Sequence, residues 1–264
     1  MNILALGDIF GKPGRRAVAK LLPEIIEKYS IDYVIVNGEN SAGGKGITPE
    51  IAEELLSLPI DVLTTGNHIW EHKTLTPYLS THPILRPINI KEQRPGKGYG
   101  IANVAGCRVA VVSLQGQIYM DSKGPAVTNP FHYMDAFLPF LQEKSDIIIV
   151  DFHAEATSEK RALGWYLDGR IAAFLGTHTH VQTSDEEILP LGTAYISDLG
   201  MTGPHYSVIG LDKDIAINRF LTGEKKSFKV AKDGVRVEGV VMKINDSSGK
   251  AETIERIRLY FTEQ

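Results

Sequence analysis

Short apolar runs that each end in a polar turn recur along this chain, and they constrain its fold more than any other feature. Residues 3–6, 33–36 and 61–65 are such runs. A short apolar run bounded by turn residues predicts a buried strand. Apolar residues at helical spacing occupy residues 17–29, and Thr48-Pro49 predicts the start of a second helix. Strand, polar turn and helix therefore alternate, which is typical of an α/β fold.

Later segments extend this pattern. They are predicted to form a hairpin (100–104 with 108–113), two helices (133–143 and 159–167), two buried strands (147–150 and 171–175) and a C-terminal hairpin (235–244 with 254–261). Pro23 lies inside the first helical pattern, so we expect a kink or two shorter helices there. No linker, repeat or low-complexity tract divides the 264 residues, which predicts one α/β domain with mixed sheets over residues 1–264.

Metal-capable side chains follow five of the apolar runs. They are Asp8, Glu39, Asn40, Asn67, His68, His153, His178 and His180. Open α/β sheets bind their ligands beyond the carboxyl ends of the strands, so we expect these side chains to converge. Carboxylates, amides and imidazoles without a thiolate suit first-row metals such as Mn, Fe, Co, Ni or Zn. The number of candidates is enough for two metals that share a bridging carboxylate, the arrangement of two-metal phosphoryl-transfer sites.

Each motif is weak by itself. A His-x-His pair occurs by chance, Gly-Asn-His is often a capped turn, and a lone histidine beside Asp151 is often a hydrogen-bonded core residue. The conjunction of all of them at strand ends carries the prediction. Two interpretations of Asp151 stay open: it orients a ligand histidine through a hydrogen bond, or it is a solvated residue at a strand end. Thr177 and Thr179 are interpreted as packing residues, because they alternate with the histidines along a strand. The remaining histidines are interpreted as surface or hydrogen-bonded residues: His72, His82, His132 and His205.

The motifs in their chain order resemble the calcineurin-like metallophosphoesterase superfamily, and within it the bacterial YmdB-type phosphodiesterases. The motifs are Gly7-Asp8, Gly38-Glu39-Asn40, Gly66-Asn67-His68, His153 and Gly176-Thr177-His178-Thr179-His180. Stretches around Gly11, Lys160 and Gly203 also match the YmdB type, so the resemblance covers nearly the whole chain. It implies a four-layer αββα sandwich. Two positions depart from the wider superfamily: Phe10 stands where a histidine is usual, and Glu39 followed by Asn40 replaces an aspartate.

The resemblance also implies a ligand set. One metal would be held by Asp8, Glu39, Asn40 and His180, and the other by Glu39, Asn67, His153 and His178. The Asn40 amide oxygen would replace the missing imidazole, and Glu39 would bridge. A metal-activated hydroxide would attack phosphorus, and His68 would act as general acid on the leaving oxygen. The implied substrates are 2′,3′-cyclic nucleotides or related small phosphodiesters, the implied metals are iron or manganese, and the implied assembly is a homo-oligomer.

Composition limits the other functions. The net charge of −4 and the pI near 6.1 argue against a protein that holds nucleic acid stably through phosphates. No run approaches the length of a membrane helix, and the N-terminus lacks a basic region before its apolar stretch, so a cytoplasmic enzyme without membrane contact is expected. Lys225 and Lys226 are expected to be solvated.

Three other functional classes use related motifs. A nucleotide-binding P-loop needs glycine, four residues and then Gly-Lys-Ser/Thr. The glycine-rich stretch here does not fit this pattern, because Gly43 and Lys45 are each followed by glycine. An amidohydrolase would carry its His-x-His pair on the first strand, and here the pair comes late. A metal-binding regulatory or scaffold protein with slow or incidental chemistry stays open.

Overall fold

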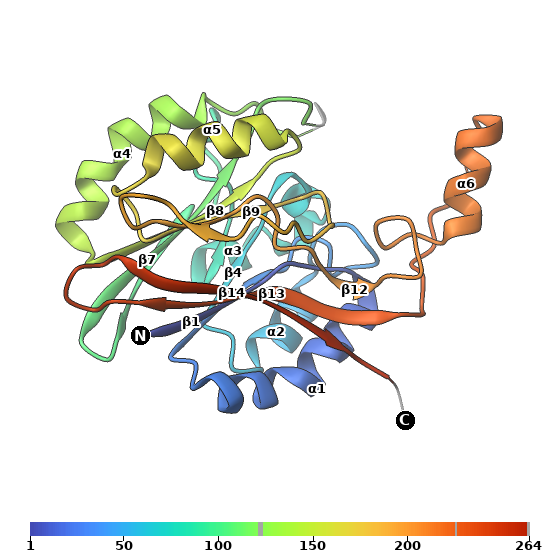
Figure 1. Cartoon of the computed structure of the whole chain (residues 1–264). Coiled ribbons are helices and arrows are strands. Elements are labelled where there is room, and N and C mark those ends of the chain that lie inside the picture. Colours follow the sequence, from blue (N-terminus) through green and yellow to red (C-terminus); the bar gives the residue numbers. More distant parts are fainter. Residues whose placement is uncertain (121–123, 225, 263–264) are drawn as a thin grey trace.

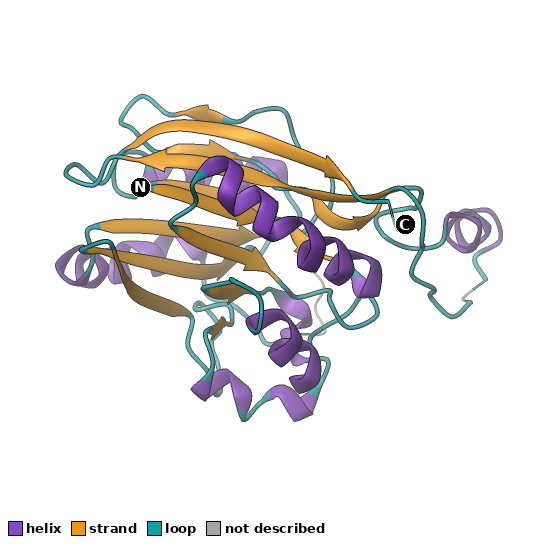
Figure 2. Cartoon of the chain, turned by 90° about the horizontal axis from the view of Figure 1, so that it is seen from below, coloured by secondary structure: helices purple, strands orange, loops and turns teal. Residues whose placement is uncertain are grey.

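Two mixed β-sheets lie face to face at the centre of the structure, and helices cover the outer face of each (Figures 1 and 2). This computed structural model describes residues 1–120, 124–224 and 226–262. Lys225 lies outside the described residues. The layers form the αββα sandwich that the resemblance implies, so the predicted fold class is confirmed.

The first sheet has the strand order β2-β12-β13-β1-β3-β4-β5, and β14 pairs with β13. β1, β3, β4 and β5 run parallel, whereas β13 is antiparallel to both β1 and β14. The predicted C-terminal hairpin is therefore present. The strands of this sheet are β1 (Asn2–Leu6), β2 (Asp8–Ile9), β3 (Tyr33–Asn37), β4 (Val62–Thr64), β5 (Ile84–Leu85), β12 (Met201–Pro204), β13 (Val235–Ile244) and β14 (Ala251–Tyr260).

The second sheet has the strand order β10-β11-β9-β8-β7-β6. β7, β8, β9 and β11 are parallel, and the antiparallel pair of β6 and β7 is the predicted hairpin. The strands are β6 (Tyr99–Val104), β7 (Cys107–Gln115), β8 (Ile147–His153), β9 (Ala173–Thr177), β10 (Glu187–Ile188) and β11 (Ala194–Ile196).

Helices α1 and α2 cover the first sheet, α4 and α5 cover the second, and α6 projects away from the body (Figure 1). The helices are α1 (Gly11–Tyr29), α2 (Pro49–Leu56), α3 (Tyr78–Thr81), α4 (Pro130–Lys144), α5 (Thr157–Leu167) and α6 (Lys213–Thr222), with 3₁₀ turns η1 (Asn67–Trp70) and η2 (Lys73–Leu75). Pro23 lies within one continuous α1, so the expected division into two helices is wrong. Pro23 and Ala19 are both exposed, so water can reach the carbonyl of Ala19 that loses its N–H partner.

The central strands are buried on both faces, which explains their continuous apolar runs. In β1, Ile3 and Ala5 pack into the core between the sheets, while Leu4 and Leu6 pack into the core beneath α1 and α2. This alternation follows from the two-residue period of a strand. A third core lies between the second sheet and the helices α4 and α5. None of the described helices has the length and apolar character needed to span a membrane.

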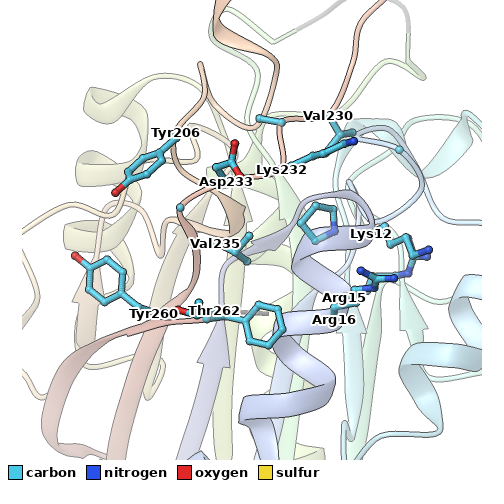
Figure 3. A pocket seen from close by; sticks show the side chains of 15 residues that line it. Lys12, Arg15, Arg16, Tyr206, Val230, Lys232, Asp233, Val235, Tyr260 and Thr262 are labelled. Carbon is cyan, nitrogen blue, oxygen red and sulfur yellow. The ribbon is translucent and has the colours of Figure 1, made fainter. Parts of the chain in front are cut away.

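A cavity of about 990 Å³ lies beside the start of α1 and the loop before β13 (Figure 3). Lys12, Arg15, Lys232 and Asp233 are among its lining residues, together with the ring of Tyr260. None of the eight predicted site residues lines it. The predicted chemistry is therefore located elsewhere, at the carboxyl ends of the parallel strands.

Candidate functional site

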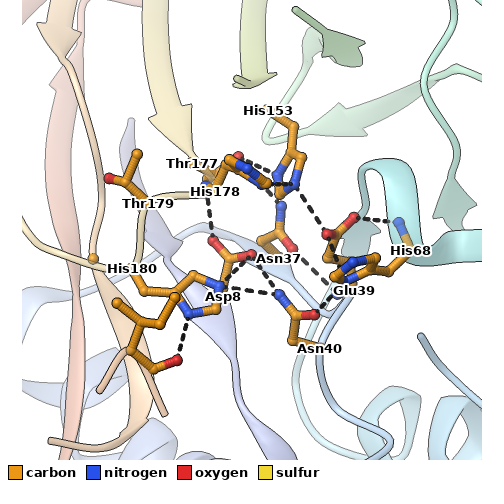
Figure 4. A network of polar contacts seen from close by, with 12 residues as sticks. Asp8, Asn37, Glu39, Asn40, His68, His153, Thr177, His178, Thr179 and His180 are labelled. Atoms are coloured by element: carbon orange, nitrogen blue, oxygen red, sulfur yellow. Dashed lines mark hydrogen bonds and ion pairs between the residues drawn. The ribbon is translucent and has the colours of Figure 1, made fainter. Parts of the chain in front are cut away.

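The structure brings seven of the eight predicted side chains into one connected polar network at the carboxyl ends of β1, β3, β4, β8 and β9 (Figure 4). The eighth, Asn67, directly precedes His68 at the start of η1. Parallel strands of both sheets end at this edge, so turns that are far apart in the chain meet there. The predicted convergence is thus a property of the structure.

Asp8 reaches the site because the chain leaves β1 through Gly7. A Cβ at Gly7 would lie 2.1 Å from the carbonyl oxygen of Gly200, so only glycine fits. Asp8 is fully buried, and its Oδ1 accepts a hydrogen bond of 3.2 Å from Asn40 Nδ2. Burial acts to raise the pKa of Asp8, but the hydrogen bond and the charge of His180 outweigh burial and lower the pKa well below its usual value.

His180 has its tautomer set by the loop that leads to α6. Its Nδ1 donates to the carbonyl oxygen of Ile209 at 3.0 Å, which leaves a lone pair on Nε2. That Nε2 lies 3.1 Å from Asn40 Nδ2 and 3.6 Å from Asp8 Oδ1. The imidazole therefore offers a coordinating nitrogen beside a buried carboxylate.

Glu39, His153 and His178 form the second half of the site, and their ligating atoms all lie within 4.8 Å of one another. His153 Nε2 is 3.0 Å from Glu39 Oε1 and 2.9 Å from His178 Nδ1. Burial would lower the pKa of His153, but the Glu39 carboxylate outweighs it and raises the pKa to about 9. For His178, burial and the nearby charge of His153 lower the pKa to about 3.

A hydrogen-bond chain from Asp151 through Thr177, which the sequence had led us to interpret as a packing residue, fixes the orientation of His153. Thr177 Oγ1 donates to Asp151 Oδ1 at 2.7 Å and accepts from His153 Nδ1 at 3.0 Å. Asn37 Nδ2 donates to Asp151 Oδ2 at 3.1 Å. Burial raises the pKa of Asp151 to about 6. His153 Nε2 is therefore the nitrogen that faces the site, and Asp151 belongs to the network rather than to a solvated strand end.

The residues after β9 do not continue as a strand. His178 and His180 have positive φ angles of 101° and 65°, so the backbone turns at both. Thr179 donates from its backbone N–H and its hydroxyl to Asp198 Oδ2, at 3.0 and 2.7 Å. Asp198 also pairs with Lys160 Nζ at 2.9 Å, and both are buried. The interpretation of Thr177 and Thr179 as packing residues was wrong, because Thr177 bonds His153 and Thr179 bonds Asp198.

His68 and Asn40 face each other across the site. His68 Nδ1 lies 2.8 Å from Asn40 Oδ1, and the His68 backbone N–H donates to Glu39 Oε2 at 3.3 Å. The side chain of His68 is 23% exposed, whereas that of Glu39 is fully buried. The amide oxygen of Asn40 thus points to His68, and its nitrogen points to Asp8. Coordination through the Asn40 oxygen requires a half-turn of the amide, a choice that the hydrogen-bond network decides.

The remaining histidines lie outside this network. His205 Nε2 contacts the carbonyl oxygen of Met201 at 3.0 Å and lies 3.7 Å from Glu238 Oε2. His72 Nε2 bonds the carbonyl oxygen of Lys45 at 3.1 Å. Neither contacts a predicted site residue in the part of the chain that the structure describes, which agrees with their interpretation as hydrogen-bonded residues.

The donor set fits a bound cation. Among the described residues, Glu39 Oε1 and Asn67 Oδ1 are buried oxygens without a hydrogen-bond donor. Thr177 accepts from His153 Nδ1, so Nε2 is the nitrogen that faces both Glu39 Oε1 and His178 Nδ1. A buried cluster of electron pairs needs a positive charge between them, supplied either by a proton or by a metal ion. Oxygen and nitrogen donors in this arrangement suit a divalent first-row metal.

The fold and the site together define a metallophosphoesterase. The chain belongs to the YmdB-like protein family, which it matches over residues 4–257. It is 44% identical over 258 residues to the 2′,3′-cyclic-nucleotide 2′-phosphodiesterase of Bacillus subtilis. This alignment covers 97% of the chain and 96% of the relative. The chain is therefore an enzyme of the metal-dependent phosphodiesterase class.

Solved structures agree with this assignment. A structure described as a novel phosphatase from Mycoplasma pneumoniae superposes with a TM-score of 0.93 at 34% identity, over 98% of this chain and 93% of the other. A putative 5′-nucleotidase from Staphylococcus aureus gives a TM-score of 0.65 at 16% identity, over 100% of this chain and 55% of the other, which shows the shared fold alone.

Proposed function

We propose that this enzyme hydrolyses 2′,3′-cyclic nucleotides, or small phosphodiesters related to them, at a site that holds two metal ions. The observation that carries the proposal is the cluster of carboxylates, amides and imidazoles in which Glu39 contacts both His153 and His68 (Figure 4). The substrate is inferred from the Bacillus subtilis relative, which is named for 2′,3′-cyclic nucleotides. Iron and manganese are the proposed metals, with zinc, cobalt and nickel as alternatives that accept the same ligands.

The proposed ligands divide into two sets that share Glu39. One set is Asp8, Glu39, Asn40 and His180, and the other is Glu39, Asn67, His153 and His178. The contacts support this division, because Asp8, Asn40 and His180 contact one another, as do Glu39, His153 and His178. Bound metals would supply Lewis-acid stabilisation of phosphoryl charge and acidify water. The buried carboxylates and imidazoles hold the reacting group in place and exclude bulk water.

His68 is the proposed general acid. It is more exposed than Glu39 and Asp8, so it can reach a phosphodiester at the mouth of the site. In the orientation that the structure shows, Asn40 Oδ1 accepts the proton on His68 Nδ1 and fixes the plane of the ring. The half-turn that coordination requires would bring the amide nitrogen of Asn40 to His68 instead. When both ring nitrogens carry protons, Nε2 offers the second proton to the leaving oxygen. A positioned general acid contributes roughly 10²–10⁴-fold to the rate.

The first test is hydrolysis of 2′,3′-cyclic AMP by protein stripped of metal and then supplied with manganese or ferrous iron. Metal-dependent release of a nucleoside monophosphate is the expected result. No turnover in a protein that still binds two ions per chain would contradict the proposed activity. It would favour the regulatory or scaffold role that the sequence left open.

The second test separates the acid from the ligands. His68→Ala is expected to lower kcat by roughly 10²–10⁴-fold while metal content stays unchanged, because the side chain acts on the leaving oxygen. His82→Ala is the matched control, since the side chain of His82 bonds only to Thr81 and Tyr78 in the described structure. If His68→Ala also loses metal, His68 is a ligand and the assignment is wrong.

The homo-oligomer is proposed on the resemblance alone, and the other properties that follow are proposed from the composition and patterning of the sequence. We infer a homo-oligomer in the cytoplasm, built from one domain over residues 1–264, with neither stable nucleic-acid binding nor membrane contact. Gel filtration with light scattering tests the assembly, and fractionation of cells tests the location.

A further inference from the structure

The cavity beside the start of α1 is lined by both basic and aromatic side chains. Its volume of about 990 Å³ lies at the upper end of the range of pockets that hold small molecules. Figure 3 shows Lys12, Arg15 and Arg16 on one side of it, and the rings of Tyr206 and Tyr260 on the other. A ligand that fills this cavity would therefore meet cationic groups at one end and flat rings at the other.

The charge of the cavity is opposite to that of the whole chain. The chain carries a net charge of −4, but the described lining residues include four basic side chains against one carboxylate, that of Asp233. The basic residues are Lys12, Arg15, Arg16 and Lys232. A concave surface of one sign concentrates ions of the opposite sign, so this cavity favours an anionic ligand.

The start of α1 strengthens the positive field. This helix has no acidic residue in its first turn, and Lys12, Arg15 and Arg16 lie in its first six positions. The positive end of the helix dipole lies at the same place, so cations there cost stability rather than add to it. Such a departure from the usual charge pattern of a helix is expected where the residues serve binding.

Lys12 and Lys232 are exposed, and neither has a hydrogen-bond or ion-pair partner among the described residues. Arg15 is partly engaged, because its Nη1 donates to the carbonyl oxygen of Ser41 at 2.7 Å and its Nε pairs with Glu54 at 2.9 Å. The two lysines are therefore the groups most available to contact an anion, and Arg15 adds its charge from the wall.

The two tyrosine rings are held in place although they bury little of their surface. Tyr206 and Tyr260 are 66% and 67% exposed. The ring of Tyr206 lies so close to Gly234 that a Cβ there would be 2.7 Å from it, and the φ angle of 66° also favours glycine at this position. The guanidinium of Arg236 lies 4.9 Å from the centroid of the Tyr260 ring. Exposed rings fixed in this way are suited to stack on an aromatic ring of a ligand.

Phe10 and the loop after Asn40 separate the cavity from the proposed metal site. Gly43 of this loop lines the cavity, whereas a Cβ at Gly44 would meet the Phe10 ring at 2.7 Å. The same ring contacts that of His180, with the two centroids 5.5 Å apart. The cavity is therefore a neighbour of the proposed metal site and not a part of it.

We propose that this cavity is a second ligand site, which binds a nucleotide. The phosphate lies against Lys12 and Lys232, and the base stacks on the tyrosine rings. The two kinds of lining select this class together, because basic residues alone would accept any small anion and exposed rings alone any flat apolar molecule. A nucleotide combines a phosphate with a base that stacks on aromatic side chains. No lining residue is a proposed metal ligand, so this site is independent of the proposed phosphodiesterase activity.

Isothermal titration of the full, metal-loaded chain with 5′-AMP tests the proposal, because 5′-AMP has no phosphodiester to hydrolyse. The titration is then repeated after a chelator has removed the metal. A binding site that persists after chelation is the expected result. Binding that disappears with the metal belongs to the proposed metal site and overturns the proposal, as does a failure to bind 5′-AMP at millimolar concentration.

Lys12→Glu tests the position of the phosphate. In the chelated chain it is expected to raise the dissociation constant for 5′-AMP by about 10-fold or more, because repulsion replaces attraction. The variant should stay folded, since a glutamate suits the positive end of α1 better than a lysine does. Lys20→Glu is the matched control, because Lys20 is exposed on the same helix outside the cavity. Equal dissociation constants in wild type and Lys12→Glu would place the nucleotide elsewhere and overturn the proposal.

Tyr260→Ala tests the position of the base. It is expected to raise the dissociation constant for 5′-AMP by roughly 5- to 100-fold, and to leave that for inorganic phosphate unchanged. Phe220→Ala, which removes an 86% exposed ring on α6 outside the cavity, should change neither. If Tyr260→Ala leaves 5′-AMP binding unchanged, or weakens phosphate equally, the cavity is a plain anion site and the nucleotide is wrong. Binding of a short RNA that depends on Lys12, in a chain that does not bind 5′-AMP, would assign the cavity to RNA instead.

Discussion

Replacing Thr177 by valine tests the reasoning about the site most directly. The hydroxyl links two buried groups, since it donates to Asp151 Oδ1 at 2.7 Å and accepts from His153 Nδ1 at 3.0 Å. Valine has almost the same volume but neither donates nor accepts. Thr177→Val therefore leaves a buried carboxylate oxygen and a buried N–H without partners, while the packing is largely kept.

The magnitude follows from these two groups. Each buried unsatisfied group costs about 1–3 kcal/mol, so Thr177→Val, which leaves two of them, should destabilise the fold by roughly 2–6 kcal/mol. His153 also loses the partner that fixes its tautomer. Loss of such a partner of a ligand histidine typically lowers metal affinity by about 10–100-fold. Thr177→Ser keeps the hydroxyl and should retain most of the affinity.

The assay is titration of stripped protein with manganese, read as bound metal per chain, beside urea unfolding of the stripped form. A lower affinity in Thr177→Val that Thr177→Ser restores supports the hydrogen-bond chain. Equal manganese affinity in wild type and Thr177→Val would refute it, because the tautomer of His153 would then be fixed by something else. Turnover is measured at saturating metal, where Thr177→Val should recover most of the wild-type kcat.

Three further predictions follow from buried contacts. Lys160→Met should lower the free energy of unfolding by about 3–5 kcal/mol in urea, because it leaves the buried Asp198 carboxylate without its cation, and a loss below 1 kcal/mol would contradict this. Gly7→Ala should cost about 3 kcal/mol, since the new Cβ would clash with the Gly200 carbonyl, whereas Gly100→Ala, whose Cβ would have 3.7 Å of space, should be tolerated. Removal of metal by a chelator should lower the midpoint of thermal unfolding, and manganese at 100 times its dissociation constant should restore about 2.7 kcal/mol per site. A midpoint that does not respond to manganese would argue against a metal bound to the folded state.

The predicted and observed strands agree best where burial alone decides both the sequence pattern and the secondary structure. Residues 33–36 and 147–150 are apolar throughout because β3 and β8 are buried on both faces, so pattern and burial give the same answer. β8 nevertheless extends to His153, beyond the apolar run. Parallel pairing with β7 and β9 continues through Asp151 and His153, and this pairing is not encoded in hydrophobicity.

Two local errors have the same origin. Alternation along a strand assigned Thr177 and Thr179 to packing, but β9 ends at Thr177 and the next residues take positive φ angles. The turn is held by Asp198 and Lys160, which lie far away in sequence. Lys160, in the middle of a helical pattern, was the one residue that could have indicated this buried pair. The sequence by itself does not show that its side chain is buried.

The sequence by itself determined which polar residues meet at one edge of the sheets, because a strand end must place its polar residues at the edge of a buried sheet. It also determined the layers, since runs of fully apolar residues alternate with amphipathic helices. Only the tertiary structure decided which nitrogen of His153 and His180 faces the site, which way the Asn40 amide points, and that Lys12 and Tyr260 line one cavity. These depend on partners such as Asp151 and Ile209, which are brought close by packing between distant segments rather than by local spacing along the chain.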